Sequence, residues 1–186
     1  GMLINALRDR NPTVILEYRT LYELEGNVVN NDPIPFGKAK IVKRGNDITI
    51  VSVSFMTIEA IEAVKELRKV GISAELIDLR SIRPLDSDTI IKSVKKTGRL
   101  VVVDTSWELC GVAGEIVAIV AEKAFHLLKS PAKRITLPNC PAPVSHELEK
   151  VFYPSAETIY KACLSIMGQK IKNKYNSKII DDFKGP

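Results

Sequence analysis

The chain has 186 residues and a mass of 20.6 kDa; 45% of its residues are hydrophobic and 26% are charged. This length suits one domain with a sizeable core, and the composition excludes wholesale disorder. No apolar run approaches the roughly 20 residues that a membrane-spanning helix needs, and no signal peptide opens the chain, so we expect no membrane partner.

The net charge of +5 comes from 27 basic and 22 acidic side chains. Residues 169–186 hold five lysines and two aspartates, which places +3 in this tail and leaves +2 for the rest of the chain. Nucleic-acid binding requires basic side chains clustered on one face, and a nearly neutral body lacks them. We therefore predict no nucleic-acid partner and a basic, flexible tail over residues 169–186.

The three cysteines, Cys110, Cys140 and Cys163, are odd in number and too far apart in sequence to form a Cys-x-x-Cys pair. With only His126 and His146 to join them, the chain has no recognisable set of zinc ligands. We predict free thiols in a reducing compartment, a cytoplasmic protein and no metal site.

Strand and helix patterns follow one another along the chain. A short strand is predicted over Thr13–Glu17, and the turn-rich stretch Glu25–Gly37 is predicted to be an extended lead-in. From Lys38 onward, β-branched segments alternate with segments whose apolar residues recur at helical spacing. The predicted strands are Ile48–Ser54, Ser73–Leu79, Leu100–Val103 and Ala132–Leu137, and the predicted helices are Thr57–Val70, Ser87–Lys96, Gly111–Leu128 and Ser155–Met167.

This alternation requires β-α-β crossovers and therefore predicts an α/β fold with a mainly parallel sheet covered by helices. In such sheets the functional loops lie beyond the carboxyl ends of the strands. That rule selects three candidate segments, Ser54–Thr57, Arg80–Asp86 and Asp104–Gly114.

The third segment combines two glycines with the only tryptophan. The Gly111-x-x-Gly114 spacing can leave helix N–H groups open to an anion, although it matches neither the dinucleotide fingerprint nor a Walker motif. Tight turning and close packing would explain the same glycines without a ligand. Glu115 complements the helix dipole but would repel a phosphate. Trp107 is predicted to be either a lid over a cleft or an interface anchor.

The second segment carries two arginines, Arg80 and Arg83, ahead of the predicted helix cap Asp86. They could bind a carboxylate or phosphate, or they could pair with acids of a neighbouring subunit or domain. Elsewhere, the adjacent Ser145 and His146 cannot converge as a nucleophile and its base, and His146 is predicted to start a helix. The residues therefore predict no self-contained catalytic set.

Five segments in register resemble the carboxyl-terminal part of the beta subunit of the decarboxylating component of 2-oxo acid dehydrogenase complexes. That group includes the pyruvate, branched-chain and acetoin enzymes, and the same domain recurs in transketolase and 1-deoxyxylulose-5-phosphate synthase. The resemblance covers about Leu3 to Met167. The segments are Ala6–Tyr22, Pro35–Ser52, Ala74–Asp86, Lys95–Ile116 and Cys140–Ile159.

The resemblance implies a Rossmann-like, three-layer α/β/α domain with a mainly parallel five-stranded sheet. It implies a homodimer through this domain, an alpha subunit in an α2β2 assembly, and docking of the acyltransferase core at a carboxyl-terminal end that this chain extends by its tail. Thiamine diphosphate and magnesium are expected in the complete enzyme, held by a Gly-Asp-Gly motif and a pyrimidine-binding domain outside this chain. In relatives a histidine often stands at the position of Tyr18.

These implications predict residues 1–37 as lead-in and remnant of the pyrimidine-binding domain, residues 38–168 as the transketolase C-terminal-like domain, and residues 169–186 as the tail. The expected role is that of an assembly and interface domain, inactive alone, without catalytic or cofactor-binding residues of its own. The alternatives are a stand-alone module that binds a small anion, or a domain of a transketolase-type enzyme. The candidate anion or interface residues are Arg80, Arg83, Trp107, Gly111, Gly114 and Glu115.

Overall fold

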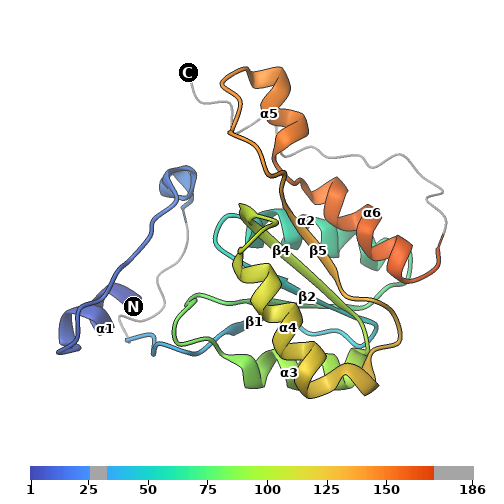
Figure 1. Cartoon of the computed structure of the whole chain (residues 1–186), viewed down its shortest axis with the longest axis horizontal. Coiled ribbons are helices and arrows are strands. Elements are labelled where there is room, and N and C mark those ends of the chain that lie inside the picture. The colour runs from blue at the N-terminus through green and yellow to red at the C-terminus, as the bar shows by residue number, and fades with distance from the viewer. Residues whose placement is uncertain (26–32, 170–186) are drawn as a thin grey trace.

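A five-stranded sheet with helices on both faces forms the body of the protein (Figure 1). The computed structural model describes residues 1–25 and 33–169. The sheet has the order β1-β3-β2-β4-β5, in which β1 is antiparallel to β3 and every other pair is parallel. This confirms the predicted mainly parallel sheet. The strands are β1 (Lys40–Lys43), β2 (Ile48–Ser52), β3 (Ala74–Asp78), β4 (Leu100–Trp107) and β5 (Lys133–Leu137).

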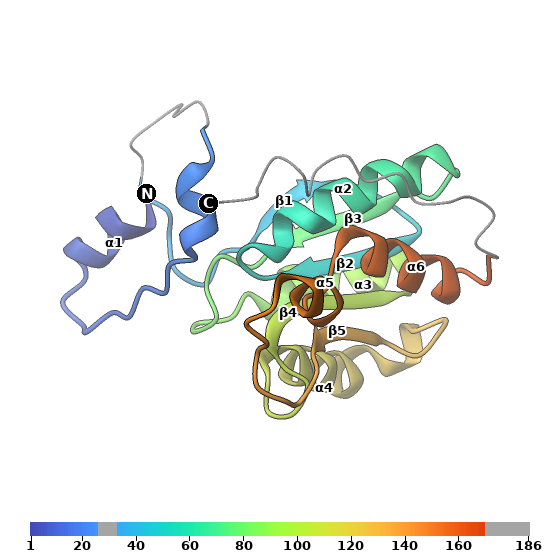
Figure 2. The ribbon, with the colours of Figure 1, turned by 90° about the horizontal axis from the view of Figure 1, so that it is seen from above.

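The helices divide between the two faces of the sheet, as Figures 1 and 2 show. α2 (Met56–Lys69) and α6 (Ala156–Ile166) pack on one face, and α3 (Ser87–Thr97) and α4 (Val112–Ala124) pack on the other. Side chains alternate along each strand, so a strand between two helical layers must be apolar on both sides. All five residues of β2 are accordingly buried.

Two elements have caps that agree with their sequences. Asp86 accepts a hydrogen bond from the Thr89 N–H at the start of α3, and Gly98 ends that helix in the left-handed conformation with φ +72°. Ser155 caps α6 in a capping box with Thr158. A side-chain acceptor at a helix start satisfies an N–H group that has no partner within the helix.

Three predicted boundaries differ from the structure. Thr13–Glu17 is an extended segment and not a strand, because it pairs with no strand of the described residues and leaves Val14 and Leu16 85% and 90% exposed. The predicted helix Gly111–Leu128 ends at Ala124 and is followed by the 3-10 turn η2 (Phe125–Leu127). β4 continues to Trp107 and therefore includes the start of the predicted loop.

Strand β1 and two short helices near the amino terminus were not predicted from the sequence. α1 (Met2–Arg8) and the 3-10 helix η1 (Arg19–Glu23) have no buried residue and lie beside the sheet (Figure 1). Between β5 and α6 lies the short helix α5 (His146–Phe152), which begins at His146 as predicted. Part of the predicted lead-in, residues 26–32, and nearly all of the predicted tail, residues 170–186, lie outside the described residues.

Candidate functional site

The chain turns sharply just after each of the three central strands. Ser54, Arg80 and Cys110 have φ values of +53°, +60° and +59°, and they follow β2, β3 and β4 by two or three residues. Left-handed backbone is uncommon for residues other than glycine and is enriched at functional sites. The three turns lie in the three segments that the sequence selected. We call this side of the sheet, where the parallel strands end, the carboxyl edge.

A small polar cluster joins the ends of β2 and β3. The hydroxyls of Ser52 and Thr57 lie 3.0 Å apart, and the Thr57 hydroxyl donates to Asp78 Oδ1 at 3.4 Å. The Arg80 N–H donates to the same oxygen at 3.3 Å, and Arg80 Nε lies 3.9 Å from Asp78 Oδ2. Burial raises the pKa of Asp78, and the Arg80 N–H and guanidinium oppose the shift. Arg80 is thus committed to a neighbouring carboxylate.

The loop between β3 and α3 is tied to the segment that precedes β1. The Ser81 hydroxyl donates to the Pro84 carbonyl at 2.9 Å and accepts the Gly37 N–H at 2.9 Å. Asp86 accepts the Ala39 N–H at 3.0 Å. Burial alone would raise the pKa of Asp86, but its hydrogen bonds from the Ala39 N–H and from Thr89 hold the pKa below its usual range.

A pocket of about 500 Å³ lies beside the loop that joins β4 to α4. Arg134 of β5 supplies the guanidinium group that lines this pocket. Its Nη1 donates to the Glu108 carbonyl at 2.8 Å, and its Nη2 donates to Glu108 Oε1 at 3.0 Å. The pocket therefore offers one paired cation against the carboxylates of Glu108 and Glu115. It is lined by Glu108, Leu109, Cys110, Gly111, Gly114, Glu115, Arg134 and Asn139.

The two glycines of this loop differ in what surrounds them. A Cβ atom on Gly111 would lie 2.3 Å from both Ser106 Oγ and the Trp107 carbonyl oxygen. A Cβ atom on Gly114 would meet only Arg134 Nη1, at 3.7 Å. The Ser106 hydroxyl is itself held by a hydrogen bond to Asp104. Gly111 is therefore required by close packing, whereas the space around Gly114 would admit a methyl group.

The predicted site residues separate into two groups. Gly111, Gly114 and Glu115 line the pocket together, whereas Arg80, Arg83 and Trp107 do not line it. Arg83 is exposed beyond β3, and Trp107 is 55% exposed at the end of β4. Sequence patterns missed Arg134 because its role depends on the register that places β5 beside β4. An arginine in a short strand after the glycine loop was the only available signal.

Apolar side chains are exposed on the loop and the helix that follow β4 and β5. Val144, Leu148 and Val151 are 97%, 59% and 86% exposed. Their spacing of four and three residues suits one side of a helix, and α5 holds the last two. Leu109 is exposed beside Trp107 in the neighbouring loop. The carboxyl edge thus carries several exposed apolar side chains that could contact a partner.

The part of the chain that the structure describes contains no group of metal ligands and no helix that could span a membrane. No three Cys, His, Asp or Glu side chains of these residues gather where they could hold a metal ion. Magnesium bound to a diphosphate requires oxygen ligands together, so these residues do not fit that cofactor. None of the described helices is long and apolar enough to span a membrane.

Comparison with known proteins identifies the family. The transketolase C-terminal domain matches residues 37–159, well over half of the chain. The chain belongs to this family. The beta subunit of acetoin:2,6-dichlorophenolindophenol oxidoreductase from Cupriavidus necator is 45% identical over 168 residues, which are 90% of this chain and 50% of that protein. The beta subunit of the pyruvate dehydrogenase E1 component from Rickettsia bellii is 44% identical over 163 residues, 87% of this chain and 50% of that protein.

A solved structure agrees with this transketolase C-terminal assignment at the level of the fold. A split-gene transketolase, described as an inactive beta4 tetramer, superposes with a TM-score of 0.64 at 24% identity and covers 76% of this chain and 46% of its own. The chain spans about half the length of the curated relatives it matches, and it is homologous to their carboxyl-terminal half.

Proposed function

We propose that this chain is the assembly domain of a thiamine-diphosphate-dependent 2-oxo acid dehydrogenase beta subunit. In this role it holds two copies together, contributes to an α2β2 assembly with an alpha subunit, and does not catalyse alone. Thiamine diphosphate and magnesium would be bound by partner domains. The beta-subunit relatives support the enzyme class. Docking of an acyltransferase core belongs to the same proposal.

The exposed apolar side chains at the carboxyl edge are the observation that carries this proposal. Val144, Leu148 and Val151 are exposed on the segment that follows β5, and Trp107 is an exposed aromatic side chain at the end of β4. Aromatic and apolar side chains dominate the energetics of protein interfaces. The interface loops would then be those that carry Arg80, Arg83 and Gly111–Glu115.

Sedimentation of the 186-residue chain tests the assembly role. We expect the wild-type chain to dimerise at micromolar concentration and the Val151→Asp variant to be monomeric, because a carboxylate cannot be buried unpaired in an apolar interface. Val70→Asp is the matched control, since Val70 is also exposed but lies beyond α2 at the opposite side of the sheet. A wild-type monomer at high micromolar concentration would count against the proposal.

Calorimetry tests the absence of independent catalysis. The described residues lack the clustered oxygen ligands of a magnesium–diphosphate site, so we expect the isolated chain not to bind thiamine diphosphate with magnesium. Micromolar binding by this chain would refute the division of labour between domains.

The alternative is a stand-alone module that binds a small anion at Arg83 and the Gly111 loop. Arg134 in the Gly111 pocket is already paired with Glu108, and Glu115 adds a second carboxylate, so the charge of this pocket favours the assembly role. An anion present at about 100 times its dissociation constant would raise the free energy of unfolding by about 2.7 kcal/mol. A reconstituted complex that transfers ketol groups would instead favour a transketolase-type enzyme.

A further inference from the structure

A groove of about 400 Å³ lies at the side of the sheet opposite the carboxyl edge, where β1 ends and β2 and β3 begin. We call this side the amino edge and the concavity the amino-edge groove. Its floor is apolar, from Val64, Ile72 and Ala74, and its rim is cationic, from Lys43, Arg44 and Arg68. It is lined by Lys43, Arg44, Val64, Arg68, Gly71, Ile72, Ser73 and Ala74.

The rim brings three positive charges together without a carboxylate. No acidic side chain lines the groove. Within residues 1–25 and 33–169, neither Lys43, Arg44 nor Arg68 takes part in an ion pair. The dipole of α2 accounts for a cation at Arg68, in the last turn of that helix, but not for the two that face it from the end of β1. Mutual repulsion of three such charges is relieved by a bound anion.

The two turns that form the groove are held rigidly against each other. The N–H groups of Asn46 and Asp47 both donate to the Ser73 carbonyl at 2.9 Å, and the Ser73 N–H donates to Asp47 Oδ2 at 2.7 Å. Gly45, next to Arg44, packs so closely that a Cβ atom there would lie 2.2 Å from the Ala74 carbonyl carbon. A site whose walls are fixed before binding avoids the entropic cost of ordering them.

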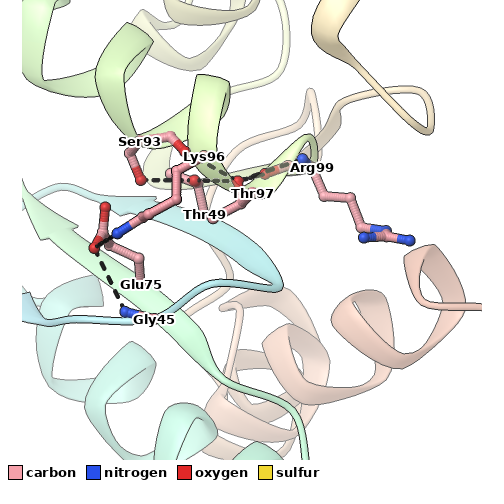
Figure 3. A network of polar contacts seen from close by, with 7 residues as sticks. All are labelled: Gly45, Thr49, Glu75, Ser93, Lys96, Thr97 and Arg99. Carbon is pink, nitrogen blue, oxygen red and sulfur yellow. Dashed lines mark hydrogen bonds and ion pairs between the residues drawn. The ribbon is translucent and has the colours of Figure 1, made fainter.

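The nearest buried carboxylate belongs to the other face of the sheet. Glu75 follows Ala74 in β3, so its side chain points to the α3 face, where Lys96 pairs with it (Figure 3). The Gly45 N–H also donates to Glu75, at 3.4 Å. Glu75 therefore holds the turn that carries Arg44 from the opposite face of the sheet. The Asp47 carboxylate accepts the Ser73 N–H beside the groove, but it does not line the groove and forms no ion pair with Lys43, Arg44 or Arg68.

We propose that the amino-edge groove binds a small phosphate monoester. Two guanidinium groups and an ammonium group match a dianionic phosphate, since arginine binds phosphate oxygens in bidentate fashion. The apolar floor suits the organic part of the ester, and the volume lies within the range of small-molecule sites. Three cations around a short groove suit one such group better than an extended polyanion, which requires a longer basic track.

Calorimetry with two probes tests the proposal. At constant ionic strength, we expect the wild-type chain to bind phenyl phosphate more tightly than inorganic phosphate, because only the ester contacts Val64 and Ile72. The Arg44→Ala/Arg68→Ala variant should lose about tenfold or more in affinity for phenyl phosphate. Lys69→Ala is the matched control, because Lys69 lies next to Arg68, pairs with Glu66 and does not line the groove.

A second measurement places the ligand without a variant. In the wild-type chain, phenyl phosphate should shift the amide resonances of Gly71 and Ser73 and leave those of Gly111 and Gly114 unchanged. Shifts confined to Gly111 and Gly114 would overturn the proposal and favour the carboxyl-edge pocket. Equal binding of the two probes, unchanged affinity in the double variant, or no binding of either probe at millimolar concentration would also overturn it.

Discussion

Replacing Gly111 by alanine tests whether close packing shapes the pocket beside the β4–α4 loop, which we call the carboxyl-edge pocket. The backbone of Gly111 has φ −77° and ψ 159°, a conformation open to any residue, so the substitution carries no conformational penalty. The whole cost is steric, because the new methyl group would stand 2.3 Å from the Trp107 carbonyl oxygen and from Ser106 Oγ. Overpacking of this kind costs about 1–3 kcal/mol, and a contact with backbone places this one near the upper end.

Gly114→Ala is the matched control, because the same methyl group is added three residues later. The nearest atom, Arg134 Nη1, lies at an ordinary contact distance of 3.7 Å. Gly114 lies in the first turn of α4, where alanine is favoured over glycine by about 0.5–1 kcal/mol. The two variants should therefore shift the free energy of unfolding in opposite directions and differ by about 3 kcal/mol.

Urea denaturation followed by circular dichroism gives both free energies. The Gly111→Ala chain should also show changed exposure of Trp107 in fluorescence quenching, because the displaced carbonyl belongs to that residue. Equal stability of the two variants would refute the packing argument, and it would return the glycine spacing to a ligand-based explanation.

Further substitutions test the rest of the fold. Glu59 of α2 accepts the Ala156 N–H at 2.6 Å and so caps α6; Glu59→Ala should lower the free energy of unfolding by about 1–3 kcal/mol, measured in urea. Burial raises the pKa of Glu59, so the wild type should lose stability relative to Glu59→Gln as pH rises from the unfolded pKa to the folded pKa. Burial alone would raise the pKa of Glu75, but hydrogen bonds from Lys96 and Ser93 lower it. The contribution of Glu75 to the free energy of unfolding should therefore be lost as pH falls through the lowered pKa of the folded state. Lys96→Met should weaken this loss, measured by urea unfolding at a series of pH values. Burial raises the pKa of Cys163 to about 12, so a thiol reagent should modify the two exposed cysteines and reach Cys163 only in denaturant.

Local patterns predicted the central strands and helices because the apolar residues within each element already indicate which of its faces are buried. Ile48–Ser52 is apolar or small throughout, and only a strand covered on both faces needs that composition. The cap at Asp86 and the stop at Gly98 were equally readable, since each acts within one turn of its helix.

Several of the failures concern partners that a local pattern does not contain. The segment Thr13–Glu17 has strand-forming residues but pairs with no strand of the described chain, and an unpaired strand is not stable. β1 was missed because it is short, ends in lysines and borders only β3. Arg134 was missed for the same reason, because only the parallel register with β4 brings it to Glu108.

The same dependence on partners separated the predicted anion-binding residues. Arg80 lies against Asp78 after β3, and Arg134, the arginine beside the glycine loop, pairs with Glu108, so neither guanidinium is left with an uncompensated charge. Lys43, Arg44 and Arg68 line a different pocket, at the amino edge, and none of the three forms an ion pair within the described residues. Charge balance within a pocket is a property of the fold, and sequence spacing does not report it.

We therefore predict that dimerisation at the carboxyl edge and phosphate-ester binding at the amino edge are independent of each other. A dimer built through Val151 at the carboxyl edge would leave the amino-edge groove open, because the parallel strands separate the two edges. The affinity for phenyl phosphate should then be the same in the wild-type dimer and in the monomeric Val151→Asp variant, and it should not vary with protein concentration. An affinity that changes with dimerisation would refute this independence, because binding and assembly are coupled only when they share residues or a conformational change.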